Sequence, residues 1–547
     1  MREIISEKLL QAREYEAREG ARVSGDERPG YHFTPRIGWL NDPNGLSFYD
    51  GQYHLFYQYH PYNSHWGPMH WGHAVSEDMI TWEYLPAALA PDEDYDRSGC
   101  FSGTAVTMDD GSHLLMYTGC ADSPEDPTGR GRWLQSQCLA VRKPGSSEYI
   151  KYSNNPVITG ADLPEGADAY EFRDPYLWRG DDGSFCAVIA SGRCDGCGGT
   201  RVTLHRSGDG QNWGPGEVLF EDSHRIGVMW ECPNFFPMNG RYILIASPMD
   251  MQAEEEEAVG SIRFPKGNNV CYIVGDYKGK VSGESPKDKA AKSSFVPETD
   301  DKGRYRYEPV DGGLDFYAPQ VMETPDGRRV MIGWMQDPKT ANLHRREDFK
   351  VFGQMTVPRE LTLRDGRLYQ WPVRELDRYR RGRVDRRGIR IGGEWTQVPG
   401  IRGRCTDLLI EVSGAESVSG SKEAPEFREF AMRFAADTKG AAGDAGDGHF
   451  TQLRYDPLRS VITIDRSRAA GSAKECPETT LSRTIRVSRG RLGLRILIDR
   501  WSAEVFINGG EQVMSATFYT DPAADQIAFR ADGGAVVDIT GYSISRV

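Results

Sequence analysis

The chain has 547 residues, 38% of them hydrophobic and 27% charged, and a formal net charge of −14. At roughly 150 residues per domain, this length predicts more than one domain, and two large β domains would fit. The acidic excess disfavours a nucleic-acid partner, because binding phosphates needs a clustered basic face. A neutral substrate is compatible with such a surface.

The N-terminal segment predicts a short docking helix within an extension of residues 1–30. Residues 3–20 are rich in helix-forming residues, and Ile5 and Leu9 are four positions apart. The first ten residues contain no signal-peptide pattern, and no stretch approaches the about 18 apolar residues of a membrane span. We therefore expect a cytoplasmic protein with no membrane partner. The ten cysteines are ordinary usage and indicate no disulfide framework.

Five strand-like runs between residues 31 and 372 each follow an Asp-Gly or Asn-Gly step, a strong hairpin signal. The glycines are 60, 72, 57 and 87 residues apart, which suits four-stranded antiparallel units. A Ser-x-Asp-x-x-x-Trp pattern at 76–82 and again at 207–213 also indicates repetition. We predict a five-bladed β-propeller over residues 31–372. The glycines are Gly51, Gly111, Gly183, Gly240 and Gly327.

Carboxylates recur nine positions before these glycines. Three of the five positions are acidic, which chance would rarely produce with 80 acidic residues in 547. The first strand of each propeller blade lines the central channel, so residues at one offset should converge. Taken singly, each carboxylate is explained about equally well as a turn or ion-pair residue. The five positions hold Asp42, Ser102, Asp174, Glu231 and Ala318.

The sequence changes character after residue 372. Residues 373–385 are highly charged and are predicted to form a linker, and residues 386–547 contain strand-like runs. Leu494, Ile496 and Ile498 alternate with other residues, as in a half-buried strand. We predict a β-sandwich here, and therefore an all-β chain apart from the N-terminal helix.

Three converging carboxylates suit glycoside cleavage, in which one carboxylate attacks or stabilises the anomeric carbon and another protonates the leaving oxygen. Arg173 precedes Asp174 and would favour its charged form, which suits electrostatic stabilisation. Glu231 lies between Trp230 and Cys232, an apolar setting that would keep a general acid protonated. Asp42 remains as the nucleophile.

Several stretches of the chain resemble the β-fructosidases of glycoside hydrolase family 32. The resemblance is strong over residues 31–375 and looser beyond them. The stretch at 66–74 is most similar to intracellular bacterial invertases and sucrose-6-phosphate hydrolases. The motifs are WLNDPNG at 39–45, WGPMHWGHA at 66–74, GCFSG at 99–103, FRDP at 172–175 and WECPNFF at 230–236.

The resemblance implies a five-bladed propeller followed by a sandwich. It also implies a retaining hydrolase, without cofactor or metal, that releases terminal β-D-fructofuranosyl residues from sucrose or short fructo-oligosaccharides through a fructosyl-enzyme. Asp42 would be the nucleophile, Asp174 the stabiliser and Glu231 the acid/base. The substrate-binding residues would be Trp39, Asn41, Gln58, Trp66, Phe101, Ser102, Arg173 and Trp334.

Other interpretations stay open: an inverting arabinan-type hydrolase, and a non-catalytic sugar-binding propeller. A carboxyl separation of about 5–5.5 Å would imply retention, and about 6.5–9.5 Å inversion. The sequence decides neither between sucrose and sucrose 6-phosphate nor between monomer and homodimer. The acidic stretch 254–257 is expected to be a solvated loop that would repel phosphorylated substrates if it lay near the funnel rim. Cys194 and Cys197 form a CxxC without a second pair, which favours a loop over a zinc site.

Overall fold

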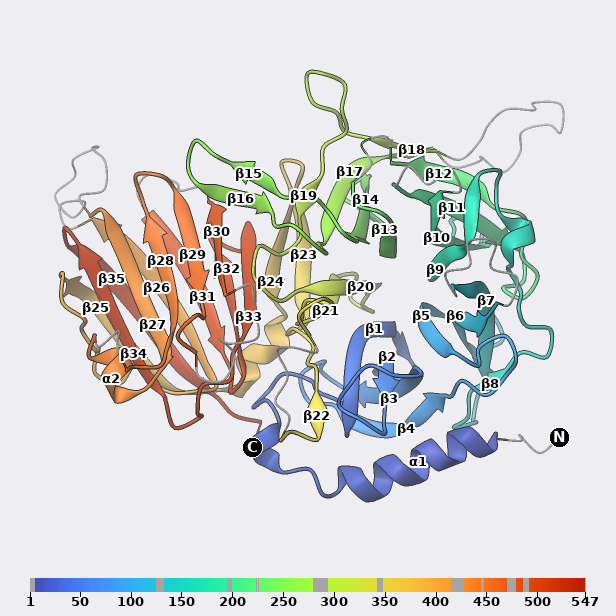
Figure 1. The fold of residues 1–547 in the computed structure, drawn as a ribbon, viewed down its shortest axis with the longest axis horizontal. Helices are drawn as coiled ribbons and strands as arrows, with labels where there is room; N and C mark the ends of the chain where they lie inside the picture. Colours follow the sequence, from blue (N-terminus) through green and yellow to red (C-terminus); the bar gives the residue numbers. More distant parts are fainter. Residues whose placement is uncertain are drawn as a thin grey trace.

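The computed structural model has a ring of β-sheets beside a two-layered β domain, with a helix along the edge of the ring (Figure 1). It describes residues 5–546 except 124–131, 194–198, 223, 225, 279–293, 342–347, 415–426, 444–446, 470–478 and 486–490. The CxxC cysteines lie outside the described residues.

Each of the five predicted glycine turns joins the first two strands of one sheet. The glycines have φ between 75° and 80°, a region that glycine adopts without strain. The hairpins are β1 (Gly38–Tyr49) with β2 (Gln52–His60), β5 (Gly99–Thr107) with β6 (His113–Asp122), β9 (Ala167–Arg179) with β10 (Phe185–Arg193), β13 (Trp230–Met238) with β14 (Arg241–Pro248), and β20 (Tyr317–Glu323) with β21 (Arg329–Trp334).

Further strands extend each sheet outward, and the sheets surround one centre with β1, β5, β9, β13 and β20 nearest to it (Figure 1). The predicted propeller is therefore confirmed. The outer strands are β3 (His70–Ser76), β4 (Glu83–Leu89), β7 (Trp133–Arg142), β8 (Ile150–Lys151), β11 (Arg201–Ser207), β12 (Glu217–Glu221), β17 (Cys271–Lys278), β18 (Ser294–Pro297), β19 (Glu308–Pro309), β23 (Arg359–Arg364) and β24 (Arg367–Pro372), with the 3-10 helix η2 (Gly160–Asp162) between β8 and β9.

The ring closes through a short strand from late in the chain. β22 (Val351–Phe352) pairs in parallel with Gly38 and Trp39 of β1. β1 therefore has hydrogen-bonded neighbours on both edges, β2 and β22.

The two Ser-x-Asp-x-x-x-Trp segments form the same turn in two different sheets. In the first, Ser76 Oγ accepts from the N–H of Asp78, and the indole of Trp82 donates to a carbonyl within the turn. Ser207, Asp209 and Trp213 repeat both contacts. The repetition seen in the sequence is thus a repetition of hydrogen bonds.

The second domain is the predicted β-sandwich. Leu494, Ile496 and Ile498 of β31 are at most 4% exposed and belong to the core between its sheets. One sheet is ordered β25 (Arg380–Ile391), β35 (Ala535–Ile544), β26 (Thr406–Gly414), β31 (Arg491–Ile498), β32 (Ser502–Ile507), β33 (Gln512–Thr517). The other is ordered β30 (Thr480–Thr484), β29 (Val461–Asp465), β28 (Thr451–Asp456), β27 (Glu429–Ala436), β34 (Gln526–Asp532), with the short helix α2 (Thr438–Ala441) after β27.

The predicted linker at 373–385 is wrong. These residues form the 3-10 helix η3 (Arg374–Tyr379) and the start of β25, an edge strand of the sandwich. Charged side chains are tolerated on an edge strand because they can remain in solvent or pair locally, as Arg383 and Asp385 do. High charge therefore did not mark a linker.

The predicted N-terminal helix is α1 (Glu7–Gly20), followed by the 3-10 turn η1 (Gly25–Glu27). Leu9 and Ala12 are buried, and the Glu16 carboxylate accepts from the N–H of Ala87 at 2.8 Å in β4. The helix therefore docks against the first propeller sheet. No helix among the described residues is long and apolar enough to cross a membrane.

The acidic stretch 254–257 is largely exposed, as expected, but it is part of a β-hairpin and not a loop. It contributes β15 (Glu254–Glu256), which pairs with β16 (Ser261–Phe264). Glu254 lies 2.9 Å from Arg263, and Glu256 accepts from Ser261 at 2.6 Å. Arg263 compensates the charge of Glu254, whereas Ser261 is a neutral donor and leaves the charge of Glu256 in place. The repulsion of phosphorylated substrates by this stretch stays a prediction.

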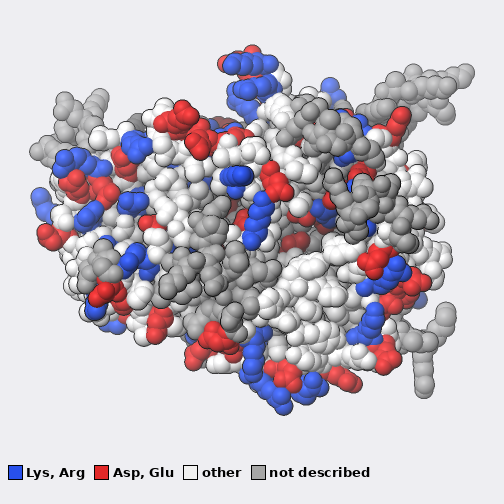
Figure 2. Space-filling model, viewed as in Figure 1, with Lys and Arg blue, Asp and Glu red and all other residues white. Residues whose placement is uncertain are grey.

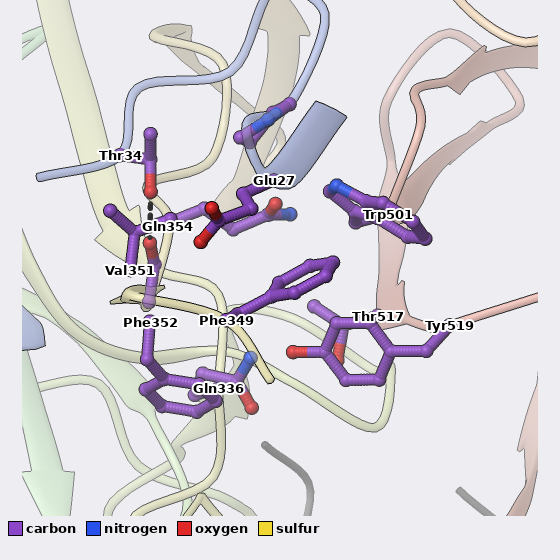
Figure 3. Close-up of a pocket in the computed structure, with 12 residues that line it drawn as sticks. Glu27, Thr34, Gln336, Phe349, Val351, Phe352, Gln354, Trp501, Thr517 and Tyr519 are labelled. Carbon is purple, nitrogen blue, oxygen red and sulfur yellow. Dashed lines mark hydrogen bonds between the residues drawn. The ribbon is translucent and has the colours of Figure 1, made fainter. Parts of the chain in front are cut away.

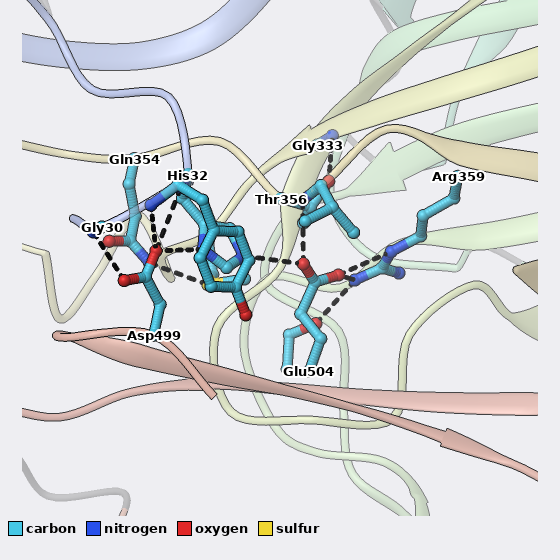
Figure 4. A network of polar contacts seen from close by, with 12 residues as sticks. Gly30, His32, Gly333, Gln354, Thr356, Arg359, Asp499 and Glu504 are labelled. Carbon is cyan, nitrogen blue, oxygen red and sulfur yellow. Dashed lines mark hydrogen bonds and ion pairs between the residues drawn. The ribbon is translucent and has the colours of Figure 1, made fainter. Parts of the chain in front are cut away.

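A buried polar network joins the two domains (Figure 4). His32 Nδ1 lies 2.7 Å from Asp499 Oδ2, and Nε2 lies 2.9 Å from Glu504 Oε1. Arg359 donates from Nε to the other oxygen of Glu504 at 2.9 Å. All four side chains are 0% exposed. We call His32, Arg359, Asp499 and Glu504 the interdomain network.

The charges of the interdomain network stabilise one another. Burial alone would lower the pKa of His32, but its two carboxylate partners raise that pKa to about 9. Burial would likewise raise the pKa of Asp499 and of Glu504, yet their cationic partners hold both below the usual range. The network is thus an array of fully paired charges.

A small cavity beside this network also lies between the domains (Figure 3). Phe349 and Trp501 pack edge to face with ring centres 5.3 Å apart, and Thr34 Oγ1 donates to the carbonyl of Gly353 at 2.8 Å. Its volume of about 20 Å³ is of the order that one water occupies. It is a packing feature of the contact between the two domains.

Candidate active site

A β-bulge interrupts each of the five inner strands close to the position nine residues before its turn. The register shifts between Leu40 and Pro43, between Phe101 and Gly103, between Arg173 and Tyr176, between Glu231 and Asn234, and between Tyr317 and Gln320. A bulge bends the strand and re-aims its side chains, and bulges are common beside active sites.

The backbone at these bulges is strained in three strands. Asp174 has φ 66°, Cys232 φ 47° and Ala318 φ 46°, in the left-handed region that side chains disfavour. Such residues cost on the order of 1–3 kcal/mol each and are held by the surrounding structure. The propeller therefore maintains a strained inner rim at the place where the carboxylates lie.

The inner strands line a pocket of about 290 Å³, which we call the carboxylate pocket. In the view of Figure 2, acidic atoms are visible in a hollow over the centre of the propeller. The structure brings together every site residue predicted from the sequence: Trp39, Asn41, Asp42, Gln58, Trp66, Phe101, Ser102, Arg173, Asp174, Glu231 and Trp334.

Asp42, on β1, is held by three donors. Ser102 Oγ donates to Oδ2 at 2.6 Å, Asn41 Nδ2 donates to Oδ1 at 3.0 Å, and the thiol of Cys232 lies 3.6 Å from Oδ2. Burial raises the pKa of Asp42 to about 6, and the charge of Glu231 adds to the rise while these donors limit it. Asp42 therefore titrates close to neutrality in a fixed orientation.

Asp174, on β9, shares the Cys232 contact. Its Oδ2 accepts from the N–H of Cys232 at 3.0 Å and lies 3.6 Å from the Cys232 thiol. Burial, together with the charges of Glu231 and Asp42, raises the pKa of Asp174 to about 7, although the charge of Arg173 acts in the opposite direction. As the sequence predicted, Arg173 lowers the pKa of Asp174, but burial raises that pKa by more.

Glu231, on β13, lies in a polar setting, so the expected apolar surroundings are wrong. Its Oε1 accepts from Nε and Nη2 of Arg173, both at 3.1 Å, and its Oε2 accepts from the hydroxyl of Tyr317 at 2.7 Å. Successive strand residues point to opposite faces, so the indole of the preceding Trp230 turns away and donates to the carbonyl of Ile226. The residues adjacent to Glu231 in the sequence therefore do not indicate the environment of its carboxylate.

Sequence reasoning missed four residues at the site. Trp133, Tyr317 and Pro338 line the pocket, and Cys232 bridges Asp42 and Asp174. Tyr317 stands ten residues before its turn glycine, the offset shared by Asn41, Phe101 and Arg173. That second offset could have found Tyr317, although its fifth member, Trp230, turns away from the pocket. No repeat signal points to Trp133.

Among the described residues, no group of three or more His, Cys, Asp or Glu side chains could hold a metal ion. Three histidines that lie close together in the sequence form local contacts: His60 with the carbonyl of His65, His70 with that of Pro68, and His73 stacked on Phe56.

Comparison with known proteins identifies the family. Residues 32–372 match the glycosyl hydrolases family 32 N-terminal domain, and residues 375–545 match the family 32 C-terminal domain. The chain belongs to glycoside hydrolase family 32. It is 34% identical to a raffinose invertase from Escherichia coli, over 93% of both chains. It is 32% identical to a sucrose-6-phosphate hydrolase from Zymomonas mobilis, over 97% of this chain and 94% of that one.

Solved structures of the family share the fold over nearly the whole chain. A family 32 β-fructofuranosidase from Bombyx mori superimposes with a TM-score of 0.76 and 29% identity, over 98% of both chains. A mutant of that enzyme has been solved in complex with sucrose and matches equally well. The two-domain arrangement of this family 32 chain is thus the one found in that enzyme.

Proposed function

We propose that this family 32 chain is a retaining β-fructofuranosidase that hydrolyses the terminal β-D-fructofuranosyl bond of sucrose or short fructo-oligosaccharides. One observation carries the proposal: carboxylates from three different propeller sheets, Asp42, Asp174 and Glu231, face one 290 Å³ pocket with aromatic walls. Aromatic faces and polar groups together suit a sugar ring. The raffinose invertase and sucrose-6-phosphate hydrolase relatives support the same substrate class.

The first step requires an ionised Asp42 and a protonated Glu231: Asp42 attacks the anomeric carbon of the fructosyl unit while Glu231 donates its proton to the departing glycosidic oxygen. Ser102 and Asn41 fix the attacking carboxylate through their hydrogen bonds. The bond to the leaving sugar breaks as the bond to Asp42 forms. Arg173 and Tyr317 hold Glu231 from two sides, which keeps the acid aimed at the leaving oxygen.

In the second step, Glu231 takes a proton from a water molecule, whose oxygen attacks the same carbon and displaces Asp42. The fructosyl–enzyme ester breaks, Asp42 leaves as a carboxylate and Glu231 regains its proton. In this scheme Asp174 binds fructose hydroxyls and offsets positive charge that develops on the ring. Two displacements return the original configuration.

The proposal is tested by the products from a substrate panel. Purified protein is incubated with sucrose, sucrose 6-phosphate, kestose, inulin and levan under matched conditions, and released fructose is measured. We expect release from sucrose, with β-fructofuranose as the first anomer seen by NMR. The opposite anomer would indicate an inverting hydrolase. No release from any substrate, with sucrose still bound, would indicate a sugar-binding propeller.

A further inference from the structure

Three aromatic rings form a wall at the mouth of the carboxylate pocket. Trp66 comes from the loop between β2 and β3, Phe101 from β5 and Trp133 from the first position of β7. The indoles of Trp66 and Trp133 stack with ring centres 5.8 Å apart and planes 16° apart. Phe101 meets Trp133 edge-on at 5.5 Å. The rings therefore form one continuous apolar surface.

This wall lies at the solvent end of the pocket. Trp66 is 41% exposed, whereas Ser102 and Asp174 are 4% and 6% exposed. Glu231 lies between these extremes, with 22% of its side chain exposed. A fructosyl ring held against the carboxylates at the inner end would thus place the leaving sugar toward the aromatic wall.

Trp133 is held firmly enough to act as a binding surface. Its backbone pairs with Asp122 at the end of the β6–β7 ladder. The preceding Arg132 lies 2.7 Å from Asp168 and over the ring of Tyr170 at 4.6 Å. The indole is therefore fixed by a strand and by an anchored neighbour, which lowers the entropy cost of stacking on it.

We propose that Trp133 is the platform for the leaving sugar, and that it recognises the apolar C–H face of a neutral sugar ring. The inference rests on the proposed function, because it assigns the second sugar of that reaction. Stacking of an indole on a sugar ring needs no charge. Trp133 would therefore contribute to the binding of substrates whose leaving group contains a sugar ring, and would contribute little where the leaving group has none.

The test compares two fructosides that differ in the leaving group. Sucrose releases a sugar ring, whereas methyl β-D-fructofuranoside releases methanol, which offers no ring to stack. For Trp133→Ala, we expect kcat/KM for sucrose to fall about tenfold, the equivalent of about 1.4 kcal/mol for one aromatic contact. We expect kcat/KM for the methyl fructoside to change by less than about twofold. Trp133→Phe should recover most of the activity toward sucrose.

Leu134→Ala is the matched control. Leu134 is the next residue on the same strand, is 43% exposed and does not line the pocket, so its truncation should leave both substrates unaffected. Equal losses on both substrates in Trp133→Ala, at an unchanged unfolding temperature, would overturn this inference but leave the proposed function standing. No loss on sucrose would overturn it as well. A wild-type protein that cleaves neither fructoside would overturn the proposed function, and this inference with it.

Discussion

The carboxylate pocket and the interdomain network both bury acidic side chains, yet they affect those side chains in opposite ways. In the pocket, burial raises the pKa of Asp42 to about 6 and that of Asp174 to about 7. In the network, Asp499 and Glu504 are buried even more deeply, at 0% exposed, but their pKa values lie below the usual range. Burial alone therefore does not determine the state of a carboxylate in this protein.

The difference lies in the partners. Asp499 and Glu504 each contact a ring nitrogen of His32, and Glu504 also pairs with Arg359. In the pocket the one arginine, Arg173, makes its ion pairs with Glu231 and Glu171, and its effect on Asp174 is smaller than that of burial. Carboxylates that are fully paired are held in their charged form, whereas the charged form is disfavoured in those held by neutral donors beside a like charge.

The largest expected effects come from removing one carboxylate charge in each region. Asp42→Asn should lower fructose release by at least about 10,000-fold, because it removes the proposed nucleophile. It should also raise the free energy of unfolding at pH 7 by up to about 3 kcal/mol. The sign follows from the raised pKa: the ionised group destabilises the fold as pH rises from 3.8 through about 6. Activity assays and urea unfolding measure both effects.

Asp499→Asn removes the corresponding carboxylate charge from the interdomain network. It leaves His32 with one charged partner in a site that is 0% exposed, so we expect a loss of about 3–5 kcal/mol in the free energy of unfolding. Turnover of the folded protein should stay unchanged. Near-wild-type turnover in Asp42→Asn, or unchanged stability in Asp499→Asn, would contradict the contrast between the regions.

A smaller effect on stability is expected when a rise in pH removes the charge of His32. The raised pKa of His32 means that its contribution to stability is complete below about pH 6.5 and is lost as pH rises through about 9. The expected loss is about 3 kcal/mol. It should appear as a falling unfolding temperature between pH 6.5 and 10 that is reduced in His32→Gln. An equal decline in the variant would assign the pH dependence to other groups.

The smallest expected effect is a shift of the pH–activity profile. Asp42 and Asp174 must both be ionised in the proposed mechanism, so kcat/KM should fall as pH drops through 7 and 6. Ser102 donates to Asp42 and lowers its pKa, so Ser102→Ala should move the acid limb to higher pH. An acid limb near pH 4 in the wild type would contradict the raised pKa values.

The propeller and the convergence of its carboxylates were predictable because repetition fixes both. Five glycine turns with a common offset require that Asp42, Asp174 and Glu231 occupy equivalent places on inner strands. Repetition also brings in Tyr317, at the neighbouring offset. Positions that share an offset from the turn glycine thus occupy equivalent places on successive sheets.

The environments of these residues were not predictable, because side chains that are adjacent in sequence diverge on a strand. Arg173 makes ion pairs with Glu231, 58 residues away, and with Glu171, but not with the adjacent Asp174. Trp133 begins the third strand of its sheet, where no repeat signal points to the pocket. Pairings set by how neighbouring sheets face one another require the three-dimensional structure.

The pairing of β22 with β1 has a consequence for biosynthesis. The strand that carries Asp42 leaves the ribosome early, but its second edge is supplied by Val351 and Phe352. The residues just before it are held by Asp499, whose carboxylate accepts from the backbone N–H of Tyr31 and His32. At roughly 5–20 residues per second, tens of seconds of translation separate these partners. During that interval the Gly38–Trp39 edge of β1 lacks its native partner, and such an unpaired edge can pair with other strands.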